Sequence, residues 1–89
     1  MSESRPIRPT DVKAGQTFDL GGIVIEIVEV IPTQDILGKK QYIIGYRIRE
    51  KDFVSPVGHW FVSEDDDIKR WIKETVEFYI RVRDMLRRG

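Results

Sequence analysis

The chain lacks cysteine and asparagine altogether and has one histidine among its 89 residues. Without cysteine it cannot form a disulfide, offer a thiolate nucleophile or build a cysteine-based zinc site. The lack of asparagine, together with many isoleucines and abundant charge, is a composition that heat-adapted proteins favour. It suggests a thermophilic source.

A charge excess and long apolar runs are also missing. The 15 basic and 15 acidic residues give a formal net charge of +0. Proteins that coat DNA non-specifically are clearly basic, whereas a chain with little self-repulsion is free to associate with itself. The longest apolar stretch, residues 23–31, is interrupted by Glu26 and Glu29 and is too polar to cross a bilayer. No apolar leader precedes it, so we expect a cytoplasmic protein without membrane contact.

Four segments alternate with a period of two residues and predict an antiparallel sheet: Thr17–Leu20, Ile23–Ile31, Gln41–Glu50 and Phe53–Val62. Between the first two, Gly21-Gly22 predicts a tight hairpin turn. Pro32 is expected to end the second strand, and Pro56 and Gly58 are expected to break the fourth. The other connections read as polar loops and turns.

Alternation also assigns side chains to faces of the sheet. It groups Ile23 with Ile25, Ile27 and Ile31; Tyr42 with Ile44, Tyr46 and Ile48; His59 with Phe61; and Trp60 with Val62. The expected buried core comprises Ile25, Ile27, Ile44, Tyr46, Phe61, Trp71, Ile72 and Phe78.

From Ser63 to Arg88 the sequence predicts one long helix. Apolar residues recur there with helical spacing: Ile68, Trp71, Ile72, Thr75, Phe78, Tyr79, Val82, Met85 and Leu86. Ser63 is expected to cap the helix. The acidic residues 64–67 would then lie at the positive end of the helix dipole, and the arginines of the last turns at its negative end.

These elements predict an α+β fold. An antiparallel strand meander would form a small, SH3-like, partly open barrel, followed by the long C-terminal helix. Residues 1–10 are expected to form a flexible tail, residues 11–62 the barrel and residues 63–89 the amphipathic helix, all within a single domain.

The apolar arc of the predicted helix is wider than one sheet requires. It spans roughly 220°, whereas a helix packed on a single sheet needs little more than ~100°. Val76 and Ile80 lie on one flank of the stripe, and Met85 marks its other edge. We expect these three residues to bind a protein partner, in the simplest case as a homodimer. The alternative is that the barrel curls around the helix and covers the whole arc.

A second interpretation is a nucleic-acid-binding module. The candidate contacts are the arginines of the third strand and of the helix: Arg47, Arg49, Arg81, Arg83, Arg87 and Arg88. Sheets that bind nucleic acid place aromatic and cationic side chains on the same exposed face. Here the tyrosines of the third strand alternate with isoleucines on the opposite face and are expected to lie in the core.

An enzyme is the weakest of the three interpretations. His59 is the only candidate general base, and no second histidine or cysteine could work with it. The run Glu64 to Asp67 could attract a cation, but consecutive helical residues point about 100° apart, and helix capping accounts for the run. We expect no catalytic, cofactor or metal site. The sequence is most typical of a non-enzymatic protein–protein interaction module (an adaptor, regulatory or structural accessory protein) that self-associates through its C-terminal helix.

Overall fold

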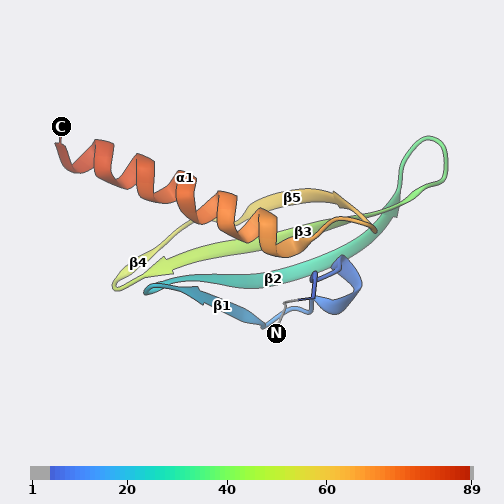
Figure 1. Ribbon diagram of the computed structural model, residues 1–89, viewed down its shortest axis with the longest axis horizontal. Helices are drawn as coiled ribbons and strands as arrows, with labels where there is room; N and C mark the ends of the chain where they lie inside the picture. The colour runs from blue at the N-terminus through green and yellow to red at the C-terminus, as the bar shows by residue number, and fades with distance from the viewer. Residues whose placement is uncertain (1–4, 89) are drawn as a thin grey trace.

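The computed structural model describes residues 5–88 and shows an antiparallel sheet of five strands followed by one long helix. In chain order the elements are the 3-10 helix η1 (Pro9–Asp11), β1 (Thr17–Leu20), β2 (Ile23–Gln34), β3 (Lys40–Glu50), β4 (Phe53–Val54), β5 (Gly58–Ser63) and α1 (Ile68–Arg88). Figure 1 shows α1 running obliquely along one side of the sheet, with its last turns reaching past the strands. The predicted α+β class is confirmed.

The sheet is an open meander. Its strand order is β1-β2-β3-β4, and β5 pairs with β3 on the same side as β4. β4 and β5 are thus two pieces of one interrupted strand, and the break includes Pro56, as the sequence predicts. In the described chain β1 does not pair with β4 or β5. The sheet is therefore not closed, and the predicted SH3-like barrel is not confirmed.

A bulge in β2 changes which of its side chains face the helix. The register with β3 moves by one residue between Ile27 and Glu29. Beyond this point Val30 lies opposite Ile44, on the helix side, and Ile31 faces the other way. The extra residue reverses the alternation. The predicted placement of Ile31 on the same face as Ile27 is therefore wrong.

β2 also continues past the proline that was expected to end it. The strand runs through Pro32 to Gln34, whereas β1 pairs with β2 only as far as Glu26. At Pro32 the strand therefore has a neighbour only on the β3 side. On such an edge the missing N–H of proline breaks no ladder bond, so the strand tolerates it.

α1 begins at Ile68, later than predicted, because Ser63 still belongs to β5. Asp67 is the cap. Its Oδ1 accepts hydrogen bonds from the backbone N–H groups of Lys69 at 3.1 Å and Ile7 at 3.0 Å. The carbonyl of Ile7 in turn accepts a bond from the N–H of Ile68 at 2.7 Å. The prediction that Ser63 caps the helix is therefore wrong.

The segment before β1 is held by this helix start. Of the tail predicted for residues 1–10, residues 1–4 lie outside the described residues. Ile7 docks on Asp67 and Ile68 through the two backbone bonds, and Pro9 is buried. From Ile7 onward the segment is therefore packed on the domain, which differs from the flexible tail that was expected.

We expect Asp67→Ala to lower the free energy of unfolding by about 1 kcal/mol at pH 7, because the variant loses the helix cap and the anchor of Ile7. The hydrogen bonds from Ile7 and Lys69 hold the pKa of Asp67 below its usual value. Such a carboxylate stabilises the fold above its unfolded-state pKa and loses this effect as pH falls through its folded-state pKa. In urea titrations the difference from wild type should therefore shrink below about pH 4. Asp65→Ala, at an exposed position, is the matched control, and equal losses in the two variants would contradict the capping role.

The core lies between α1 and the side of the sheet that α1 covers. Three helix residues at intervals of four pack against the strands: Ile68, Ile72 and Val76. The buried strand residues are Ile23, Ile25, Ile27, Ile44, Ile48, Trp60 and Val62. Trp60 stacks on Tyr46 with ring centroids 4.4 Å apart, and its Nε1–H donates to Oγ1 of Thr75 at 3.0 Å. Trp60 therefore contacts both the sheet and the helix.

Four of the eight expected core residues are fully buried: Ile25, Ile27, Ile44 and Ile72. Tyr46 and Trp71 are half-buried and pack against the same cluster. Phe61 and Phe78 are 68% and 63% exposed, so their predicted burial is wrong. Phe61 lies on the side of β5 away from the helix. Phe78 lies beside the break between β4 and β5, in an open hollow that it lines with Pro56 and Gly58.

Candidate interaction surface

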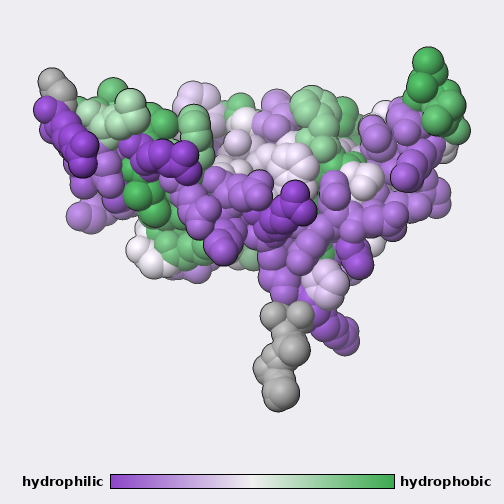
Figure 2. All heavy atoms as spheres, turned by 45° about the horizontal axis from the view of Figure 1, so that its top comes forward, coloured by the Kyte–Doolittle hydropathy of each residue, from purple (hydrophilic) through white to green (hydrophobic). Residues whose placement is uncertain are grey.

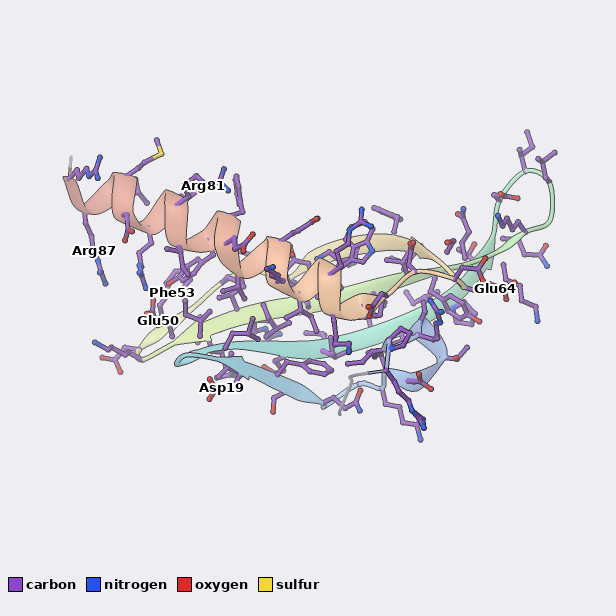
Figure 3. All side chains as sticks on the ribbon, in the orientation of Figure 1. Asp19, Glu50, Phe53, Glu64, Arg81 and Arg87 are labelled. Carbon is purple, nitrogen blue, oxygen red and sulfur yellow. The ribbon has the colours of Figure 1, made fainter. Side chains whose placement is uncertain are left out.

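Glu50, at the end of β3, ties the outer half of α1 to the sheet. Oη of Tyr79 donates to its Oε1 at 2.8 Å, and Nη1 of Arg83 donates to its Oε2 at 2.6 Å. Phe53 of β4 stacks on the Tyr79 ring with centroids 5.7 Å apart. The hydrogen bond from Tyr79 and then that from Arg83 hold the pKa of Glu50 below its usual value. Figure 3 shows Glu50 and Phe53 on the sheet side of the helix end.

Around these contacts with Glu50, α1 carries three large apolar side chains that are mostly exposed to solvent in the described chain. Phe78, Met85 and Leu86 are 63%, 65% and 77% exposed. Figure 2 shows hydrophobic side chains beside strongly hydrophilic ones over the end of α1, at the upper left. The tether fixes the direction of the helix, so these side chains are presented on a rigid element rather than on a loop.

A shallow groove of about 440 Å³ runs along the outer surface of this half of α1. Its lining alternates acidic, apolar and basic residues: Glu77, Ile80, Arg81, Asp84, Met85 and Arg88. Figure 3 shows Arg81 on the side of α1 turned away from the sheet, whereas Arg87 extends from a different side of the helix. The groove thus combines fixed charges of both signs with apolar walls.

The three residues predicted to bind a partner occupy different environments. Met85 is exposed in the groove, and Ile80 is half-buried beside it. Val76 is only 4% exposed and belongs to the core. Its predicted place on a free flank is wrong, because the row that faces the sheet passes through Ile68, Ile72 and Val76. Phe78 and Leu86, which the sequence pattern had assigned to the core-facing stripe, are exposed instead. Leu86 lies past the edge of the sheet, near Phe53.

The six predicted nucleic-acid contacts do not form one surface. Arg47 and Arg49 lie on the side of β3 away from α1, where both approach Oε1 of Glu26 at 3.9 and 2.9 Å. Arg83 forms an ion pair with Glu50. The remaining three are on the exposed part of the helix: Arg81, Arg87 and Arg88. The cations are thus divided between the two sides of the molecule, and half of them have an acidic partner.

His59 also lies on the uncovered side of the sheet. Its Nε2 is 3.6 Å from Oε2 of Glu29, and the two side chains meet across Gly45 of the strand between them. A Cβ at Gly45 would come within 3.0 Å of Cγ of Glu29, so the glycine makes room for the pair. Next to this pair, Phe61 lies opposite Ile43. His59 therefore has an acidic neighbour, Glu29, on this side of the sheet.

The turn between β2 and β3 presents two further apolar side chains. Ile36 and Leu37 are almost fully exposed at its tip, and Figure 2 shows hydrophobic side chains at this projecting end, at the upper right. Oδ1 of Asp35 accepts the N–H groups of Leu37 and Lys39 and shapes the turn. The sequence predicts a polar loop over residues 33–40, whereas the strands extend to Gln34 and from Lys40. An Ile-Leu pair between Asp35 and Gly38 was the signal that could have revealed the tip.

Within residues 5–88, no three His, Asp or Glu side chains gather closely enough to hold a metal ion. None of the described helices is sufficiently long and apolar to cross a membrane. Comparisons with protein-family models, curated proteins and solved structures find no match to this chain.

Proposed function

We propose that this chain is a non-enzymatic protein–protein interaction module, an adaptor, regulatory or structural accessory protein that self-associates through the outer half of α1. The observation that carries the proposal is the exposure of Phe78, Met85 and Leu86 on a helix fixed in direction by Glu50. Apolar side chains clustered on a rigid element and surrounded by charge are typical of protein contact sites. A net charge of +0 adds no repulsion between copies.

The proposal is tested by sedimentation velocity over a range of concentrations. Wild type should self-associate, and Phe78→Ser combined with Met85→Glu should raise the dissociation constant at least about tenfold, because it removes apolar contact area and introduces a charge. Thermal unfolding, measured at a concentration where wild type is monomeric, should change little, since both side chains are exposed in the single chain.

Ile36→Ser with Leu37→Ser is the matched control, because it removes two exposed apolar side chains at the other end of the molecule. This variant should associate as wild type does. A monomeric wild type, or an equal loss of association in the control, would overturn the proposal.

A second candidate, a nucleic-acid-binding module, has one specific observation in its favour. Phe61, expected in the core, lies exposed on the same side of the sheet as His59, Arg47 and Arg49. An aromatic ring beside cations on an open sheet face is the arrangement that stacks single-stranded bases. Glu26 offsets the two arginines, which favours the protein-binding proposal. Tight binding of a labelled single-stranded oligonucleotide at physiological salt, lost in Phe61→Ala, would reverse this preference.

A further inference from the structure

One face of the outer half of α1 carries a charge pattern that is complementary to itself. Four charged residues follow one another along the groove: Glu77, Arg81, Asp84 and Arg88. Their spacing of four, three and four residues keeps them in one narrow stripe, because an α-helix has 3.6 residues per turn. Read from either end, the stripe matches an acidic residue to a basic one: Glu77 to Arg88, and Arg81 to Asp84.

We infer that two copies of this chain pair with their α1 helices antiparallel, related by a two-fold axis between residues 82 and 83. This inference rests on the proposed self-association and specifies the orientation and register of the two helices. In this pairing Glu77 of each copy meets Arg88 of the other, and Arg81 meets Asp84. A symmetric contact uses each of these pairs twice. A parallel arrangement in the same register would instead place like charges opposite each other.

These charges are available for such a contact. Among the described residues, the side chains of Glu77, Arg81 and Arg88 take part in no hydrogen bond or salt bridge, although i,i+4 partners stand beside them. Asp84 contacts only Nε of Arg83, at 3.3 Å. Exposed charges of this kind contribute little to affinity, but they select register and orientation.

Apolar contact along one edge of the stripe would supply the affinity. Phe78 and Met85 both project from the same edge and are more than half exposed. In an antiparallel pair, equivalent edges of the two helices lie together. Met85 of one copy then lies within about 3 Å, measured along the helix axis, of Phe78 of the other, at a rise of 1.5 Å per residue. The helix contact that pairs the charges would therefore also bury both apolar side chains.

The exposed area of the chain is consistent with a second copy as the partner. It amounts to 6274 Å², against about 5,400 Å² for a compact monomer of this mass. The excess is close to the roughly 800 Å² that each partner contributes to a standard interface. The radius of gyration, 14.3 Å, likewise exceeds the roughly 12 Å of a compact chain of this length. The helix end that reaches past the sheet contributes to both features, as does the projecting turn between β2 and β3 (Figure 1).

Two single charge reversals test the geometry. Arg81→Glu puts acidic residues opposite each other in its own dimer, and Asp84→Arg does the same with basic residues. Each variant alone should dimerise at least about tenfold more weakly than wild type. In an equimolar mixture, Glu at position 81 faces Arg at position 84, and the native Asp84 faces the native Arg81. The mixture should therefore recover association to within a few-fold of wild type, as heterodimers that native mass spectrometry distinguishes by mass.

The outcomes separate this inference from the proposed function. Wild-type association that neither reversal changes would overturn the antiparallel register and leave self-association intact. If both variants lose association and the mixture does not recover it, the antiparallel register is likewise overturned and self-association stands. A wild type that stays monomeric, whether or not it captures another protein or an oligonucleotide, would overturn the pairing and the self-association together. Thermal unfolding of both variants checks that each is folded.

Discussion

Val76→Glu should leave little folded protein in buffer at room temperature. Val76 is 4% exposed and packs among Ile72 and the strand residues of the core. Burying a carboxylate there without a partner should cost at least about 4 kcal/mol. A domain of this size has only about 4–13 kcal/mol of stability in total. Circular dichroism and urea titration should show an unfolded chain, or one with a much lower midpoint.

Met85→Glu is the matched control for this prediction. It introduces the same side chain on the same helix, at a position that is 65% exposed. Its free energy of unfolding, measured at a concentration where the chain is monomeric, should stay within about 0.5 kcal/mol of wild type. If instead Val76→Glu folds normally and Met85→Glu does not, the helix packs on the sheet through the opposite face.

Trp60→Ala should have the second largest effect, a loss of about 3–5 kcal/mol. The indole is 3% exposed, stacks on Tyr46 and donates to Oγ1 of Thr75. Its removal would leave a cavity between sheet and helix, and the Thr75 hydroxyl would lose its donor. The midpoint of guanidinium unfolding should fall, with little change in the slope of the transition.

The next residue along β5 is the control. Phe61→Ala removes a side chain of similar bulk that is 68% exposed on the other side of the same strand. It should cost less than about 1 kcal/mol, because most of the ring is already in water. Comparable losses for Trp60→Ala and Phe61→Ala would show that the uncovered side of the sheet is buried in solution.

The sequence predicted the strands well because their local signals agree. Gly21-Gly22 sets the first hairpin, and in the structure both glycines have positive φ, at 63° and 93°. The alternation separated Ile44 from Arg47 within β3 and Trp60 from His59 within β5, as the register confirms. It did not show which face of β5 joins the core, because Phe61 was expected there and Trp60 is the residue that is buried. Strict period-two patterning leaves few alternatives for a strand that is covered on one side.

The features that the sequence did not reveal depend on tertiary contacts. A bulge needs only one extra residue, and Val28 looks like any other apolar strand residue until its neighbours are paired. Ser63 and Asp67 are both good helix caps, and the choice depends on how far β5 pairs with β3. The face of α1 that packs on the sheet was ambiguous for a related reason. An arc of about 220° contains two possible contact rows, and only the position of the sheet selects the row through Val76.

The bonds between Ile7 and the start of α1 also affect the order in which this chain can fold during synthesis. Each strand pairs with the strand before it in sequence, except that β5 pairs with β3 across the short β4, so the hairpins can form while the chain is still emerging from the ribosome. The N–H of Ile68, in contrast, is bonded by a residue some 60 positions earlier. The segment around Ile7 therefore cannot dock until the start of α1 has been synthesised. This side of the domain is packed only after all five strands have been made.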